Sequence, residues 1–146
     1  MMNSSSVVVD SSTCLFIVLD NPLASQIASR WQNWIRADVK TCAPSLWQNE
    51  VTSALHKVAM QKLVSEERAY DALEAILGLG VELVMEDNEL CQNAFAWATR
   101  LGQLAAYDGF YLALAERLGV EFWTADRRLV DRCHQLGSFW VHWVGE

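Results

Sequence analysis

Short runs of β-branched and aromatic residues alternate along this chain with longer segments of helical periodicity. The strand-like runs lie at 7–10, 39–43, 81–85, 120–123 and 139–144. Parallel strands need a long crossover, which a helix usually supplies, so this alternation predicts a parallel sheet with helices on both faces. We therefore expect an α/β fold: a three-layer α/β/α sandwich around a central, mostly parallel sheet of about five strands.

Helical spacing of apolar residues fills the intervals between these runs. Ser45, with Gln48 three residues later, has the spacing of a capping box, and either Asp87 or Asn88 can cap a later helix. Glycines mark several of the helix ends. The helices are expected directly after residue 10, at 23–35, at about 45–63, at about 65–77, at 89–101, at about 105–118 and from 127 to just before 137.

The length of 146 residues fits one ordinary domain, which we place at 7–146, with 1–6 as a disordered polar segment. The four cysteines form no C-x-x-C pair, so we expect four buried free thiols in a reducing cytoplasm. The apolar run 14–19 is far too short to cross a bilayer, and no basic segment precedes it. These features predict a cytoplasmic protein without a membrane anchor.

The formal net charge of -7 argues against a domain that holds nucleic acid through a broadly basic surface. It does not exclude a nuclease. A cluster of carboxylates that binds divalent cations also lowers the net charge, and a bound cation reverses the sign of the local field. The charge therefore directs attention to where the acidic residues are placed.

Four acids are predicted to meet at one edge of the sheet. Asp10 ends the first strand and Asp126 follows the fourth, while Glu50 and Asp108 lie near the N-termini of two helices. Ligands of parallel α/β sheets bind outside the carboxyl ends of the strands, and helices that run antiparallel to the strands begin at that same edge. We therefore expect the four carboxylates to share one crevice.

A shared crevice would bring strong repulsion, about 4 kcal/mol per pair at 4 Å with an effective dielectric near 20. Mg²⁺ or Mn²⁺ would compensate it, since hard cations prefer carboxylate oxygens. Each acid also has a simpler explanation by itself. Asp108 could be present because the helix dipole favours an acid in the first turn, and Asp10 and Asp126 could be helix N-caps. Glu50 could be a solvated residue of a helix surface. Their joint placement favours the metal site.

Three segments resemble the PIN-domain endoribonucleases, and most closely their VapC-like toxins. The strongest is "YDGFYLALAERLGVEFWTADRRL" (107–129), similar to the family's aspartate-led helix, strand and T-A-D turn. The others are "VVVDSS" (7–12) and "APSLWQNEVTSAL" (43–55). The likeness extends over about 7–144. Two residues depart from the usual pattern, namely Gly109, where alanine is common, and the bulky Trp123.

The resemblance implies a PIN-like fold and roles for particular residues. It implies that the metal-binding and catalytic acids are Asp10, Glu50, Asp108 and Asp126, with Ser12 and Thr124 as supporting hydroxyls. The implied activity is Mg²⁺- or Mn²⁺-dependent hydrolysis of RNA phosphodiester bonds, as the toxin half of a toxin–antitoxin pair. A small antitoxin protein and a homodimeric state are implied with it.

Three arginines follow the last acid: Arg127, Arg128 and Arg132. They are secondary candidates for contacts with RNA phosphates, because a solvated helix face is the commoner explanation of such residues.

Two other classes of function remain open from the residues. Phosphotransfer on aspartate is disfavoured, because Ser11 follows Asp10 where a receiver domain has a second acid, and Ser12 stands where a dehalogenase-like site has an aspartate. The alternative outside enzymes is a catalytically silent PIN-fold module that binds a protein partner.

Overall fold

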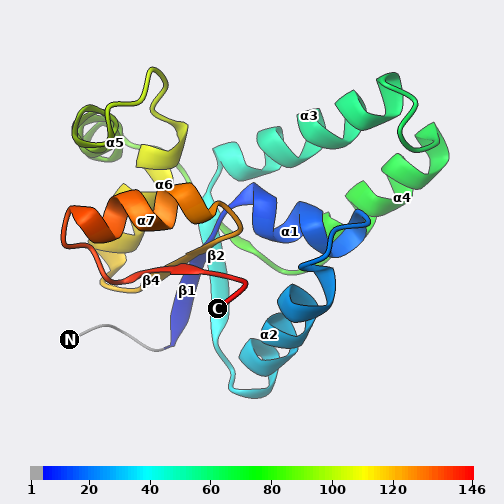
Figure 1. The fold of residues 1–146 in the computed structure, drawn as a ribbon, viewed down its shortest axis with the longest axis horizontal. Helices are drawn as coiled ribbons and strands as arrows, with labels where there is room; N and C mark the ends of the chain where they lie inside the picture. The colour runs from blue at the N-terminus through cyan, green and yellow to red at the C-terminus, as the bar shows by residue number, and fades with distance from the viewer. Residues whose placement is uncertain (1–4) are drawn as a thin grey trace.

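The computed structural model describes residues 5–146 and contains one five-stranded sheet within them. Every strand pairing is parallel, in the order β3-β2-β1-β4-β5 (Figure 1). The predicted sheet of about five strands is confirmed, and it is entirely parallel. The segment expected to be disordered lies mostly outside the described residues, but its last member, Ser6, begins β1. The strands are β1 Ser6–Val9, β2 Lys40–Pro44, β3 Glu82–Val84, β4 Glu121–Thr124 and β5 Val141–Trp143.

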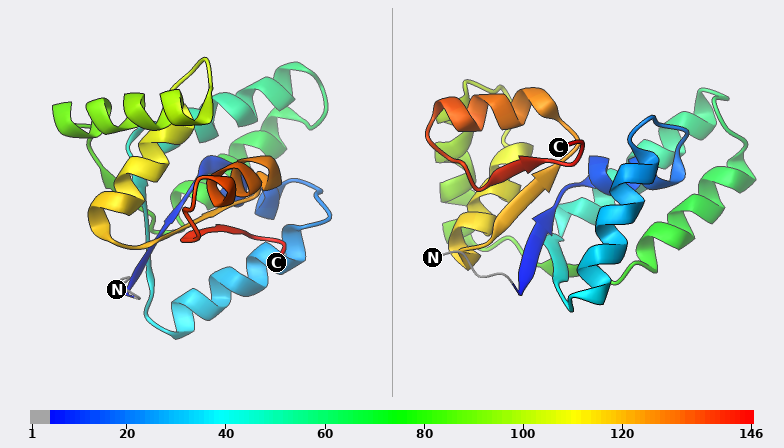
Figure 2. Two further views of the ribbon diagram at one scale, coloured as in Figure 1. Left: turned by 60° about the vertical axis from the view of Figure 1, so that its left-hand side comes forward. Right: turned by 60° about the horizontal axis from the view of Figure 1, so that its bottom comes forward.

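Helices cover both faces of this sheet, as the strand–helix alternation predicts. In Figure 1 α5, α6 and α7 lie to the left of the sheet and α1 to α4 lie to the right, with the α3–α4 hairpin projecting from the body. Figure 2 shows the same arrangement from two further sides. The helices are α1 Ser11–Val18, α2 Ala24–Arg36, α3 Leu46–Met60, α4 Glu66–Leu77, α5 Asn88–Leu101, α6 Tyr107–Leu118 and α7 Arg127–Gln135.

The core is built where the central strands meet α6. Val8 and Val9 of β1 and Phe122 of β4 are completely buried, as are Leu112 and Leu114 of α6. The last three residues of β1 and of β4 are all buried, as expected for strands of a parallel sheet that is covered on both faces. The strand that ends directly before Asp10 is therefore packed on both faces.

The start of α3 differs from the prediction. Ser45 adopts helical backbone angles and its side chain caps nothing, so the predicted capping box with Gln48 is wrong. Instead, the Ser45 hydroxyl donates to Glu86, and the Leu46 amide donates to Glu86 Oε1 at 2.7 Å. Glu86 follows β3, the neighbour of β2. A carboxylate distant in sequence has replaced the local cap, because the sheet places it at the N-terminus of α3.

Other expected boundaries shift by one to three residues. Helix α3 ends at Met60 and not near 63, because Lys62 has a left-handed backbone with φ of 60°. Asp87 is the cap of α5, and its carboxylate accepts the Leu90 amide at 2.8 Å. The prediction of four buried thiols is wrong for Cys91, which is exposed on α5, while the remaining three cysteines are buried.

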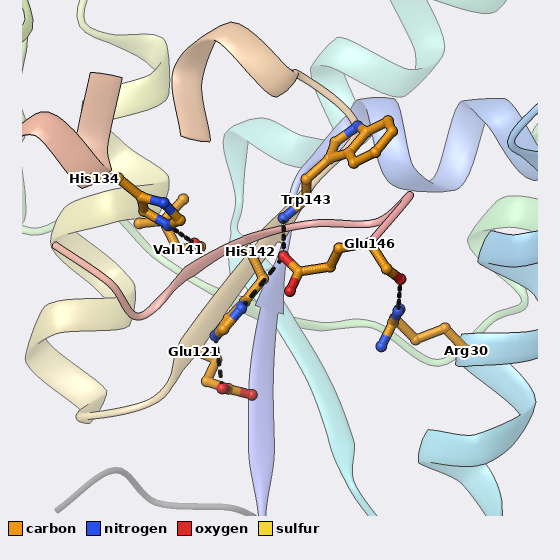
Figure 3. Close-up of polar contacts among 7 residues, drawn as sticks. All are labelled: Arg30, Glu121, His134, Val141, His142, Trp143 and Glu146. Atoms are coloured by element: carbon orange, nitrogen blue, oxygen red, sulfur yellow. Dashed lines mark hydrogen bonds and ion pairs between the residues drawn. The ribbon is translucent and has the colours of Figure 1, made fainter. Parts of the chain in front are cut away.

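Strand β5 lies at one edge of the sheet and is fixed by polar contacts (Figure 3). His142 contacts Glu121 at 2.8 Å through Nε2 and Glu146 at 3.5 Å through Nδ1, and its ring stacks on Trp123 at 4.6 Å. The Val141 carbonyl lies 2.7 Å from Nε2 of His134 in α7. Helix α7 is thereby tied to the strand that follows it. None of the helices within residues 5–146 is long and apolar enough to span a membrane.

The close packing of α5 against α6 explains why glycine, and not the more common alanine, stands at position 109. Helices α5 and α6 approach so closely that a Cβ at Gly109 would overlap the carbonyl oxygen of Ala94. The more common alanine therefore does not fit this chain.

We predict that Gly109→Ala destabilises the protein by about 1–3 kcal/mol, the usual cost of overpacking. Thermal or urea unfolding monitored by circular dichroism measures the change. The overlap is with backbone, so adding Ala94→Gly should not restore stability. A double variant as stable as the wild type would contradict this explanation.

Candidate active site at the carboxyl edge of the sheet

Two of the predicted acids are fixed by neighbouring strands. Asp10 directly follows β1 and caps α1, and Asp126 follows β4 and caps α7. Strands β1 and β4 are paired in parallel, with Val9 opposite Trp123. Both carboxylates therefore stand at the carboxyl edge, as predicted. The cap explanation for each is also correct, since Asp10 accepts the Thr13 amide and Asp126 accepts the Leu129 amide.

The other two acids come from helices that begin at this edge. Glu50 lies in the second turn of α3, and Asp108 is the second residue of α6. Tyr111, one turn after Asp108, donates its hydroxyl to Glu50 Oε1 at 2.5 Å, which joins the two helices. The Tyr111 ring stacks on Phe122 of β4, with ring centroids 5.8 Å apart. Because the Tyr111 ring is held by Phe122, its hydrogen bond to Glu50 fixes the position of the Glu50 carboxylate.

Asp10 is the most enclosed of the four acids, with 7% of its surface exposed. Its Oδ1 accepts from the Ser12 hydroxyl at 2.7 Å, the Thr13 amide at 3.1 Å and the Thr13 hydroxyl at 3.0 Å. Its Oδ2 accepts from the Thr124 hydroxyl. Burial raises the pKa of Asp10, and these hydrogen bonds offset part of that effect by stabilising the anion.

Ser12 and Thr124 therefore contact Asp10, in keeping with their expected position beside the acids. The Thr124 hydroxyl also accepts from the Asp126 amide at 3.1 Å, and the Ser12 hydroxyl accepts from the Ala125 amide at 3.3 Å. One hydroxyl thus links the acid after β1 to the backbone of the acid after β4. The turn at 124–126 is positioned by this link.

Glu50 and Asp108 are partly buried, and the pKa of each is affected by the charges of other acids of the site. Burial raises the pKa of Glu50, the hydrogen bond from Tyr111 lowers it, and the charges of Asp10 and Asp108 raise it again. Burial also raises the pKa of Asp108, with a lowering by Gln103 and a further increase caused by Asp126. The four acids are therefore connected pair by pair through electrostatic repulsion.

An open hollow of about 300 Å³ lies beside these acids. Its lining residues are Glu50, Gln103, Ala105, Tyr107 and Asp108. The Gln103 side-chain amide donates to Asp108 Oδ2 at 2.8 Å and so orients that carboxylate. A small polar ligand can reach Glu50 and Asp108 from solvent through this hollow.

The donor chemistry of the site fits a hard divalent cation. All four side chains offer carboxylate oxygens, which Mg²⁺ and Mn²⁺ prefer, and their mutual repulsion is what a bound cation would relieve. As the side chains stand, no three His, Cys, Asp or Glu residues in the described chain converge closely enough to hold an ion. The four acids share an edge of the sheet, but of the four only Glu50 and Asp108 line the hollow.

Sequence reasoning missed three residues that hold the acids. The role of Thr13 could not be recognised in the sequence, because a threonine is an ordinary residue in the first turn of a helix. Tyr111 had a detectable signal: it places a hydroxyl on the buried face of an apolar helix, one turn from Asp108. Gln103 gave none, since its contact with Asp108 depends on the path of a loop.

The three candidate RNA-binding arginines all lie on α7 and are exposed. The guanidinium of Arg127 lies 4.7 Å from the ring centre of Trp143, and Arg132 donates to Gln135 at 3.3 Å. Arg128 has no side-chain partner within residues 5–146. It is therefore the arginine most available to a phosphate.

The fold and the site together define an all-parallel α/β protein that carries four acids at the carboxyl edge of its sheet. The chain belongs to the PIN domain family, whose pattern matches residues 7–134. A curated relative, Ribonuclease VapC3 of Pyrobaculum aerophilum, is 34% identical over 84 residues. That match covers 57% of this chain and 63% of the relative, so the chain spans less than two thirds of that protein's length.

Solved structures show the same fold. DNA-bound VapBC from Salmonella typhimurium superposes with a TM-score of 0.69 and 17% identity, covering 99% of both chains. VapC20 of Mycobacterium tuberculosis, described as a toxin that cleaves the sarcin–ricin loop, gives a TM-score of 0.66 at 13% identity, covering 88% of this chain and 94% of that one. At these identities the likeness establishes architecture only.

The raised pKa values predict that the metal-free protein is stabilised by mild acid. A carboxyl whose pKa is higher in the folded state binds its proton more tightly there, so unfolding becomes harder as pH falls through that pKa, down to the ordinary value of about 4. Asp108→Asn removes one such group and lessens the repulsion on Glu50.

We therefore expect Asp108→Asn to be more stable than the wild type at pH 7 in EDTA, with the difference disappearing near pH 4. Melting temperatures across this pH range measure it. A difference that is constant with pH would show that repulsion among the acids is not its cause.

Proposed function

We propose that this protein is a metal-dependent endoribonuclease that hydrolyses RNA phosphodiester bonds, and the toxin component of a toxin–antitoxin pair. The observation that carries the proposal is the placement of Asp10, Glu50, Asp108 and Asp126 at one sheet edge of a PIN domain. The ribonuclease name of the curated relative supports the reaction.

In this proposal the four acids hold Mg²⁺ or Mn²⁺. A bound cation would supply an activated water and stabilise the leaving oxygen. Thr124 and Ser12 orient Asp10 and favour its anion through their hydroxyls, and Tyr111 and Gln103 do the same for Glu50 and Asp108. The hollow beside Glu50 and Asp108 admits the phosphodiester.

The proposed partner is a small antitoxin protein, and we expect a homodimer and a cytoplasmic location as in VapC-like toxins. Exposed apolar side chains on the α3–α4 hairpin support a protein partner: Met60 and Leu63 are each 70% exposed, and Leu77 is 49% exposed. Leu77 lines a hollow with Asn49 and Thr52 of α3, so an antitoxin segment that covers Leu77 would lie near the turn that carries Glu50.

A catalytically silent interaction module is the second candidate. It is favoured by one observation, namely that the acids of the described chain do not yet form a metal cage. Cleavage experiments decide between the two.

We predict that Asp108→Asn lowers RNA cleavage by at least about a hundredfold, because an amide is a poor substitute for a carboxylate that holds a catalytic cation. Asp108 is preferred over Asp10, whose four hydrogen bonds also maintain the fold. Purified protein is incubated with total RNA in Mg²⁺ or Mn²⁺, beside an EDTA control.

Asp131→Asn is the matched control, since it removes the same charge from an exposed position of α7. Wild-type cleavage by Asp108→Asn would disprove the assigned role. No cleavage by folded wild-type protein, freed of any bound inhibitor, would favour the interaction module.

Arg128→Ala is expected to weaken RNA binding uniformly across sequences. For single-stranded RNA, each lost phosphate contact lowers the slope of log affinity against log salt concentration by about 0.7. Fluorescence anisotropy between 50 and roughly 200 mM salt measures that slope. An unchanged slope would show that Arg128 is only a solvated helix residue.

A further inference from the structure

Tyr107 is an aromatic side chain beside the proposed catalytic acids that the cleavage chemistry does not use. It is the first residue of α6, adjacent to Asp108, and 61% of its surface is exposed. It lines the same hollow as Glu50 and Asp108. Neighbouring Cα atoms are about 3.8 Å apart, so a ligand held at Asp108 lies within reach of the Tyr107 ring.

The backbone that presents Tyr107 is fixed on both sides. On one side, Gly102 closes α5 in a left-handed conformation with φ of 70°, and the Gln103 amide donates to the Ala98 carbonyl at 3.0 Å. On the other side, Gln103 donates to Asp108 across the hollow. A ring presented by an anchored helix turn loses little conformational freedom when a ligand binds.

The charges around the hollow make such a contact useful. Its charged lining residues are Glu50 and Asp108, and the whole chain carries a net charge of -7, so nucleic acid gains little from the general electrostatic field. A bound cation would neutralise the acids locally, but it would provide no contact for the nucleotides on either side of the cleaved bond. Stacking on an aromatic ring needs no charge and tolerates any base.

Other exposed aromatic side chains do not share this position. Tyr70 is 60% exposed on α4, and Phe95 and Phe139 are also exposed, but none of them lines the hollow with the acids. Tyr107 therefore combines exposure, a fixed backbone and adjacency to the acids.

We propose that Tyr107 stacks against an unpaired nucleobase next to the scissile phosphate and so positions the substrate at the acids. Bases within a duplex have no free face for an aromatic ring, whereas splayed bases of loops and ends do. The inference rests on the proposed ribonuclease function and adds a substrate-positioning residue to its site.

The kinetic test compares Tyr107→Ala with Tyr107→Phe and with Tyr70→Ala, the matched control of equal exposure. On a single-stranded oligonucleotide, loss of one stacked base should raise KM roughly 5- to 150-fold and leave kcat nearly unchanged. Tyr107→Phe keeps the ring and should behave as wild type, as should Tyr70→Ala. The same sequence closed into a stem should be a poor substrate.

Abasic substrates locate the stacked base. A series of oligonucleotides, each lacking one base near the cleaved bond, should contain one member on which wild type and Tyr107→Ala have equal KM. A KM of Tyr107→Ala equal to that of the wild type, or an equal penalty on every abasic member, would overturn the inference.

A binding measurement separates this inference from the proposed function. In the Asp108→Asn background, with Mg²⁺ present, fluorescence anisotropy gives the Kd for the same oligonucleotide with and without Tyr107→Ala. A 5- to roughly 150-fold weakening supports stacking even if the wild type cleaves nothing. Active wild type with no effect of Tyr107→Ala on KM or Kd leaves the function intact and rejects stacking, and failure of the wild type to bind or cleave any RNA rejects both.

Discussion

The enclosure of one carboxylate, Asp10, is the constraint on which the rest of the site depends. An ion with 7% of its surface exposed must be compensated by hydrogen bonds, by a cation or by a proton. This chain supplies hydroxyls and an amide from two segments, one after β1 and one at the end of β4. The hydroxyls of Ser12 and Thr124 that stabilise Asp10 also accept the amides of Ala125 and Asp126, and so they position the turn that carries Asp126.

The remaining acids are positioned in a graded way. Glu50 and Asp108 each receive one hydrogen bond from a neighbouring side chain and stay open to the hollow, and Asp126 is exposed. Burial and the number of side-chain hydrogen bonds therefore both decrease from Asp10 to the acids nearer the solvent. The carboxylate open to solvent is therefore that of Asp126, and the carboxylate with most hydrogen bonds is that of Asp10.

The sequence predicts the architecture and the location of Asp10 and Asp126 at the carboxyl edge, because both follow from local patterns. Alternating strands and helices indicate a parallel sheet, and the carboxyl-edge rule places Asp10 and Asp126 together. The contacts that orient the acids were not predictable in the same way. Gln103 reaches Asp108 only through a loop, and Glu86 replaces the expected cap of α3 only because β3 lies beside β2. The close approach of α5 and α6 at Gly109 also could not be predicted, because it depends on how the two helices pack in three dimensions.

The cap supplied by Glu86 also restricts the short strand that precedes it. Strand β3 has three residues at the sheet edge, and its pairing with β2 places Val84 opposite Pro44. Such a strand has few backbone bonds to fix its alignment, and a slip of one residue would reverse the direction of every side chain. Glu86 would then lose Leu46 and Ser45. The Glu86 carboxylate therefore stabilises the correct register of β3 on β2. It also couples that register to the first turn of α3, the helix that carries Glu50.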